Sequence, residues 1–158
     1  MKRSWMAASL IAIAAAALPA ATANSATDEL GFVRIKPGEE EWKNPFGVGV
    51  EVATIHGDPT KPGIYVLRIR WPKGTMSTPH THGEDRHVVV LSGKWYTGTG
   101  PTFDPTKAAP LEKGAYMLHP AGAVHWDGTR EEEAIIQIIG YGPSSTKRLS
   151  EGSPFAKE

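Results

Sequence analysis

Cysteine is absent from the 158-residue sequence. Its absence excludes disulfide bridges, cysteine-ligated zinc or iron–sulfur sites and thiol nucleophiles, so a reactive centre must use other side chains, such as the six histidines. A net charge of one sign is also lacking, because 17 basic residues balance 17 acidic ones. A neutral chain has no overall field that attracts a nucleic-acid backbone. We therefore expect no nucleic-acid partner.

Long apolar runs are scarce, and the one that stands out lies at the start of the chain. Two basic residues precede the uncharged stretch 4–18, which Pro19 ends, and Ala21-Thr22-Ala23 follows. The stretch is shorter than the roughly 20 residues of a spanning helix, and A-x-A typifies a signal-peptide cleavage site. We therefore predict that residues 1–23 are a signal peptide and that the mature protein is periplasmic or secreted, with no membrane span. A single membrane anchor is the competing interpretation.

The rest of the chain predicts a single all-β domain. Glycine (17) and proline (13) are frequent, and no stretch shows a convincing 3.6-residue period with helix caps. Short apolar or alternating segments bounded by turn residues are typical of a closed or double-sheet β architecture, such as a jelly roll. We expect an N-terminal arm or edge strand over 24–45, a barrel over 46–143 and a C-terminal tail over 144–158. The expected strands cover residues 46–55, 64–71, 86–92, 94–99, 115–119, 124–127 and 134–141.

Histidines in two segments form a candidate metal site. His80 and His82 are two residues apart, so on a strand both side chains project from the same face. His125 lies in a second glycine- and proline-rich segment. Imidazoles of this kind suit Fe, Zn, Mn, Ni or Cu, and the spacing does not identify the metal. The sequence therefore predicts a divalent transition metal of unknown identity.

The two segments together resemble the conserved motifs of the cupin superfamily, in particular small exported single-domain cupins. The first motif contains H-x-H between two glycines, and the second contains P-x-G followed by a histidine. The matching positions are Gly74, His80, His82 and Gly93 in the first motif, and Gly114, Pro120, Gly122 and His125 in the second.

This resemblance implies a cupin-type jelly-roll β-barrel with a metal inside, bound by three histidines and one glutamate. His80, His82 and His125 match the three histidine positions. The resemblance also implies a homodimer, because dimerisation is usual for small cupins.

The glutamate position is the one that departs from the motif. Counting back from Gly93 puts Arg86 in this position, and a guanidinium has no lone pair for a metal. The longer motif spacing puts His87 there instead, which would give a site of four histidines. In a third interpretation, Arg86 pairs with Glu84 or Asp85 at the barrel rim and leaves a plain three-histidine centre. Alternation does not decide, because residues 88–91 are all apolar.

Three functions remain open at this point. The first is a metal-dependent enzyme, such as a dioxygenase or isomerase, that acts on a small organic molecule and in which Arg86 is the catalytic residue that anchors a substrate carboxylate. The second is a non-catalytic periplasmic protein that binds a metal or small ligand, and the third is a structural dimer without metal. We expect His119 to be a strand-end residue bonded to the backbone, with a catalytic role as the alternative.

Overall fold

The structure is a computed structural model that describes residues 27–150 and 153–157. The predicted signal peptide lies outside the described residues. Within them the regular structure is almost entirely β, and the only helical element is the 3-10 turn η1 (Pro105–Lys107). In this described part of the chain, no helix meets the length and hydropathy that crossing a bilayer demands.

The first sheet is antiparallel, and apart from the short β8 its strands are rich in β-branched residues, which favour a pleated and half-buried surface. Its central strand, β10 (Ala134–Gly142), pairs with β2 along its whole length and with β5 on the other side. The order of the sheet is β1 (Glu51–His56), β2 (Gly63–Trp71), β10, β5 (Arg86–Ser92) and β8 (Tyr116–His119).

The second sheet consists mostly of short strands and carries the three motif histidines, His80, His82 and His125. Its order is β11 (Thr146–Arg148), β4 (His80–His82), β9 (His125–Gly128), β3 (Thr75–Ser77) and β12 (Phe155–Lys157). β6 (Lys94–Thr99) pairs with β9 and with β7 (Ala109–Glu112).

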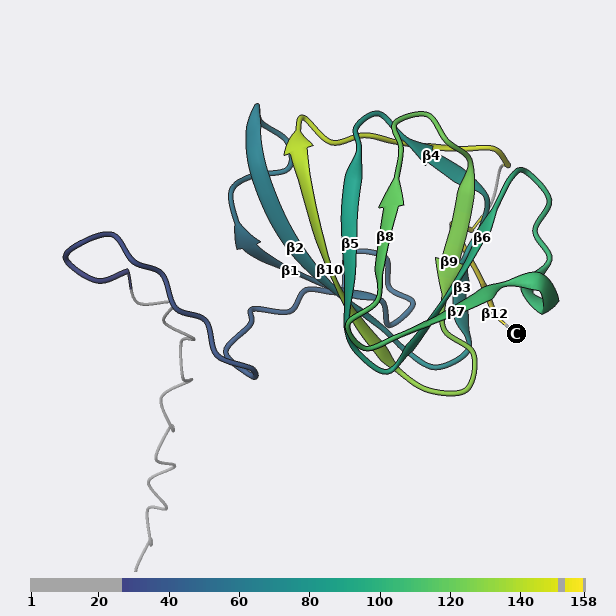
Figure 1. Cartoon of the computed structure of the whole chain (residues 1–158), viewed down its shortest axis with the longest axis horizontal. Coiled ribbons are helices and arrows are strands. Elements are labelled where there is room, and N and C mark those ends of the chain that lie inside the picture. Colours follow the sequence, from purple (N-terminus) through teal and green to yellow (C-terminus); the bar gives the residue numbers. More distant parts are fainter. Residues whose placement is uncertain (1–26, 151–152, 158) are drawn as a thin grey trace, which may run out of the picture.

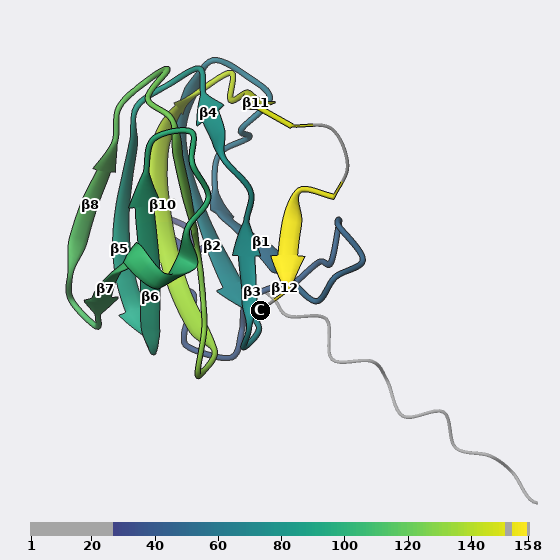
Figure 2. The same cartoon turned by 90° about the vertical axis from the view of Figure 1, so that its right-hand side faces the viewer.

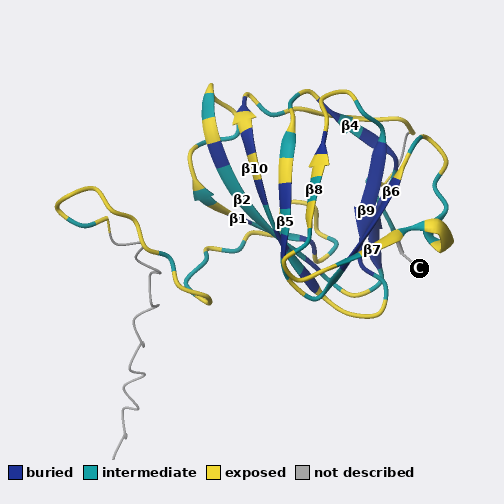
Figure 3. Ribbon diagram, viewed as in Figure 1, coloured by how far each residue is buried: buried dark blue, intermediate teal, exposed yellow. Residues whose placement is uncertain are grey.

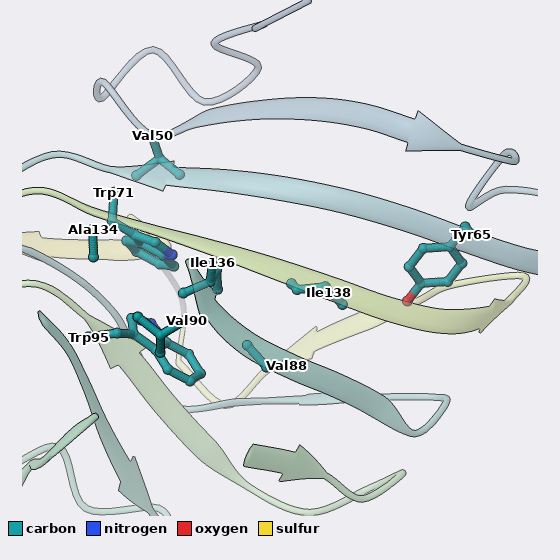
Figure 4. Packing of buried hydrophobic residues seen from close by; sticks show 9 residues of the cluster. All are labelled: Val50, Tyr65, Trp71, Val88, Val90, Trp95, Ala134, Ile136 and Ile138. Atoms are coloured by element: carbon teal, nitrogen blue, oxygen red, sulfur yellow. The ribbon is translucent and has the colours of Figure 1, made fainter. Parts of the chain in front are cut away.

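The two sheets face each other and enclose the core, which confirms the predicted all-β jelly-roll barrel (Figures 1 and 2). The core cluster consists of inward-facing side chains from both sheets (Figure 4). Its buried members are Val50, Tyr65, Trp71, Val88, Val90, Trp95, Ala134, Ile136 and Ile138.

Strand β9 is buried along its entire length (Figure 3). His125 and Asp127 share one face, and Trp126 projects to the other face, where it packs with Met76 and Tyr96. Phe103, from the loop that precedes η1, covers this second cluster, with its ring centroid 5.2 Å from that of Trp126. Packing on both faces therefore fixes the strand that carries His125.

The glycine that closes the first motif makes the turn between β5 and β6 possible. Gly93 has a φ of +70°, a conformation that non-glycine residues rarely adopt. A Cβ at this position would also collide with the carbonyl oxygen of Glu133. Both constraints explain why glycine occupies this turn.

The two flanking segments differ from each other. Residues 27–45 extend from the barrel as an arm with two isolated bridges, Thr27 to Val33 and Lys43 to Val52 (Figure 1). The segment 144–158, expected as a C-terminal tail, contains two short strands: β11 pairs with β4, and β12 pairs with β3. Short edge strands with few apolar residues give little sequence signal, and their pairing depends on the strands they meet.

Candidate metal centre

The three histidines of the motifs converge inside the barrel. His80 and His82 lie on the same face of β4, and the pairing of β4 with β9 sets His80 opposite His125. Their ring centroids are 4.4 to 5.0 Å apart, and all three side chains are buried. One ligand nitrogen from each lies within 4.8 Å of the others. This separation is small enough for one ion to contact all three after a modest adjustment.

Hydrogen bonds on the outer side of the rings orient all three histidines. Nδ1 of His82 lies 3.3 Å from the carbonyl oxygen of Ser145 and 3.1 Å from the hydroxyl of Thr146. Nδ1 of His80 lies 2.8 Å from the carbonyl oxygen of Thr78, and Nδ1 of His125 lies 3.1 Å from that of Ala123. A carbonyl oxygen only accepts hydrogen bonds, so Nδ1 carries the proton and Nε2 keeps its lone pair. Metal-binding histidines are usually held in this way.

Arg86 projects into the barrel beside His82. It shares its face of β5 with the buried Val88 and Val90, and its side chain is 12% exposed. Nη1 lies 3.1 Å from Nε2 of His82, and Nη2 donates to Oγ of Ser144 at 2.6 Å. The position of the motif glutamate therefore holds a cation that engages one of the motif histidines.

Glu84 fixes the guanidinium from the other side. Its Oε1 accepts hydrogen bonds from Nε of Arg86 at 2.8 Å and from the hydroxyl of Tyr65 at 2.7 Å. Burial opposes ionisation of Glu84, but these hydrogen bonds hold its pKa below the usual value. The pair matches the predicted contact of Arg86 with Glu84, although Arg86 lines the cavity and does not lie at the rim. Asp85 instead accepts a hydrogen bond from the backbone of Ala121.

His87 does not join the cluster. The four-histidine alternative is therefore wrong. The residue follows Arg86 on β5, so it projects to the outer face of the sheet, where it is exposed. Its Nδ1 lies 2.8 Å from the hydroxyl of Tyr116, a neighbour from β8.

Two further residues of the cluster were not predicted as ligands. His119, on β8, is 3% exposed, and its ring centroid lies 3.8 Å from that of His125. Neither of its ring nitrogens has a hydrogen-bond partner in the described part of the chain, contrary to the expected backbone bond. Asp127, on β9, is 5% exposed. Its position two residues after His125 is the one sequence signal that could have identified it.

Burial lowers the pKa of three imidazoles of the cluster, those of His82, His119 and His125. Desolvation, reinforced by the charge of Arg86, lowers the pKa of His82 to about 2. Desolvation likewise lowers the pKa of His119 to about 3 and also depresses that of His125, against the opposing charge of Asp127. Neutral imidazoles have lone pairs available for a metal ion at neutral pH.

The cluster forms part of the wall of a small cavity. Its volume is about 200 Å³, below the range of about 300–1,000 Å³ typical of pockets for drug-sized molecules. Apolar side chains such as Trp71, Ile138 and Phe155 line one part of it, and His80, His82, Arg86, His119 and Asp127 line another. The cavity therefore suits a molecule of few atoms that has an apolar part and an anionic group.

The residues fit a transition-metal ion. Nε2 of His125 is buried and has no hydrogen-bond partner in the described part of the chain. An unpaired buried polar atom costs free energy, and a bound ion would remove that cost. Neutral imidazoles and a carboxylate are also the donors that such ions accept.

Comparison with known proteins agrees with the fold. The family model described as the ChrR cupin-like domain matches residues 31–145. The chain belongs to this cupin family. The rhicadhesin receptor of Pisum sativum is 30% identical over 123 residues, which are 75% of this chain and 56% of the pea protein. Nectarin-1 of Nicotiana plumbaginifolia is 30% identical over 111 residues, 68% of this chain and 48% of nectarin-1. The cupin thus spans about half the length of these plant relatives.

Solved structures show the same barrel at low sequence identity. The polyketide cyclase RemF from Streptomyces resistomycificus has a TM-score of 0.64 at 12% identity, covering 78% of this chain and 89% of the cyclase. The DMSP lyase DddQ from Ruegeria pomeroyi has a TM-score of 0.56 at 14% identity, covering 70% of this chain and 61% of the lyase. At these identities the likeness concerns the fold alone.

Proposed function

We propose that this cupin is a metal-dependent enzyme that acts on a small anionic organic molecule. The observation that carries the proposal is the buried Nε2 of His125, which has no hydrogen-bond partner in the described part of the chain. Its ring lies against those of His80, His82 and His119, which line the cavity. A divalent ion in this cluster would act as a Lewis acid and, in the case of iron, would support dioxygenase chemistry. His80, His82 and His125 are the ligands that the motifs imply.

Arg86 supplies the second half of the proposal. Its guanidinium lines the same cavity, and Glu84 and Ser144 hold it in place. A guanidinium binds carboxylates through charged hydrogen bonds. The side chain is therefore positioned to hold an anionic group of the substrate beside the ion.

The fold is compatible with catalysis, since its structural neighbours include a polyketide cyclase and a DMSP lyase. One barrel can support many reactions, so this likeness supports an active site more strongly than a particular substrate. We further propose that the pattern of residues 1–23 directs export to the periplasm or outside the cell, and that the mature chain forms a homodimer.

A non-catalytic binding protein is the second candidate, and one contact favours it. Because Arg86 engages Nε2 of His82, the wild-type cluster has one donor fewer for an ion than the motif implies. A site altered in this way could keep ligand binding without turnover.

Metal and anion binding test the proposal together. Chelator-treated protein is titrated with Zn²⁺ and Fe²⁺, and the loaded protein is then screened against small carboxylates for binding and, with iron, for oxygen uptake. We expect His125→Ala to lose metal binding and Arg86→Met to lose carboxylate binding, with His87→Gln and Arg34→Met as matched controls. Carboxylate binding without turnover on any substrate would favour the binding protein. A wild-type protein that binds no metal would refute the enzyme, and one that binds neither metal nor carboxylate would refute both candidates.

A further inference from the structure

Asp127 gives the cavity a buried negative charge that the cupin motifs do not include. It shares its face of β9 with His125, and its Oδ2 lies 3.8 Å from Nε2 of that histidine. Within the described residues, the one hydrogen bond that Oδ1 accepts comes from the hydroxyl of Ser77 and is long, at 3.4 Å. A buried carboxylate is costly unless a cation or several hydrogen bonds compensate its charge. The part of the chain that the structure describes therefore gives Asp127 little of the compensation that a buried carboxylate needs.

His119 approaches the same point from the opposite sheet. Strand β8 belongs to the first sheet and β9 to the second, so His119 and His125 meet across the barrel. Both nitrogens of His119 are buried without a hydrogen-bond partner in the described part of the chain. Because an imidazole has two polar nitrogens, burying it without any partner is costly. His119, His125 and Asp127 each place a ligand atom within 4.8 Å of the other two.

The end of the cluster at His82 is less favourable for a dication than the end at Asp127. Arg86 places its positive charge against His82 and directs an N–H at the Nε2 atom that would bind the ion. A dication near the guanidinium is repelled, whereas one near Asp127 is attracted. Since His125 belongs to both groups of three, the ion can contact it in either position.

We propose that His119, His125 and Asp127 hold the divalent transition metal, so that Asp127 provides the carboxylate ligand that the motif position of Arg86 lacks. This inference rests on the proposed metal-binding function and refines the position of the ion within the same cavity. His82 then pairs with Arg86 in the part of the cavity wall that faces an anionic ligand.

Zinc titration of chelator-treated full-length protein against a chromophoric chelator tests the inference. The variants are Asp127→Asn and His119→Gln, compared with His82→Gln at the motif position. Exposed controls are Asp85→Asn for the loss of a charge and His87→Gln for the loss of an imidazole. Circular dichroism and thermal melting confirm that each variant is folded.

We expect Asp127→Asn and His119→Gln each to weaken Zn²⁺ binding by roughly 10- to 100-fold or more. His82→Gln and both controls should stay within a few-fold of wild type. The visible spectrum of Co²⁺-loaded protein should change in Asp127→Asn and remain unaltered in His82→Gln, because only a lost ligand changes the coordination of the ion.

The failure of this inference is distinguishable from that of the proposed function. Wild-type affinity in Asp127→Asn together with loss of binding in His82→Gln would overturn the inference and restore the motif triad, with metal binding itself intact. A wild-type protein that binds neither Zn²⁺ nor Co²⁺ would overturn the proposed function and, with it, the inference.

Discussion

Nη1 of Arg86 lies 3.1 Å from Nε2 of His82, so the guanidinium directs an N–H at the lone pair of a motif histidine. The contact is supported by Glu84 and Ser144 on the other side of the guanidinium. Arg86 thus has two expected effects in this cavity. It weakens metal binding by charge repulsion, and it attracts anionic ligands.

Replacing Arg86 separates these two effects. We expect Arg86→Met to raise affinity for Zn²⁺ about tenfold, because it removes a positive charge from the wall of the metal cavity. The same variant should lose binding of small carboxylates. Calorimetric titration with metal and then with carboxylate measures both changes, and Arg34→Met on the arm is the charge-matched control. A fall in metal affinity would show that the guanidinium supports the ion.

The stability of the metal-free protein should fall in acid. The pKa of His82 is lowered to about 2 and that of His119 to about 3, whereas histidines in the unfolded chain titrate near about 6.5. Between these values the unfolded chain binds more protons than the folded protein, so stability is present above pH 6.5 and is lost as pH falls. Each histidine contributes at most about 1.4 kcal/mol per pH unit.

Urea unfolding between pH 7 and pH 4.5 in the presence of a chelator measures this slope. The variant His119→Gln should unfold with a smaller pH dependence than wild type, while the exposed His87→Gln should match it. Equal slopes in wild type and His119→Gln would contradict the assignment of His119 as a buried neutral imidazole.

A substitution at Gly98 on β6 tests whether the packing around Trp126, on the outer face of β9, holds that strand in place. A Cβ at Gly98 would collide with the indole ring of Trp126, which lies between His125 and Asp127 in the sequence. We expect Gly98→Ala to destabilise the fold by about 1–3 kcal/mol, the usual cost of overpacking. It should also weaken metal binding, because β9 must shift. Urea unfolding and zinc titration check both effects, and Thr99→Ala at the exposed neighbouring position should change neither.

Strand β12 should contribute to the free energy of unfolding and to carboxylate binding in the cavity, but not to metal affinity. The ring of Phe155 contacts those of Phe46 and Trp71, with centroids 5.2 and 5.7 Å away, and lines the cavity. We expect Phe155→Ala to cost about 1–3 kcal/mol of stability and to weaken carboxylate binding, with unchanged zinc affinity. Leu149→Ala, at a 46% exposed position nearby, should alter stability by less than about 0.5 kcal/mol. A loss of zinc affinity in Phe155→Ala would contradict this division of roles.

The local sequence pattern predicted the strands that alternate or carry continuous apolar residues, and β5 and β6 begin and end where expected. It did not predict β11 and β12, because short strands at a sheet edge depend on their neighbours for pairing. The choice between Arg86 and His87 was also beyond the local pattern. Residues 88–91 are apolar on both faces of β5, so only the assembled barrel shows which face is inside.

The candidate site was predictable to the extent that it follows strand periodicity. The pair His80 and His82 and the position of Asp127 relative to His125 obey the two-residue repeat of a strand. The contact of His119 with His125 joins two sheets across the barrel, and no sequence spacing encodes it.

The most direct test of metal binding at this histidine cluster is the metal content of the purified, untagged protein, measured beside a chelator-treated control. We expect near-stoichiometric transition metal in wild type and in His87→Gln, and none above the control in His125→Ala, whose circular dichroism spectrum should stay that of a β protein. Wild-type protein that carries no metal and takes up none when Fe²⁺, Zn²⁺, Mn²⁺, Ni²⁺ or Cu²⁺ is added would contradict the account.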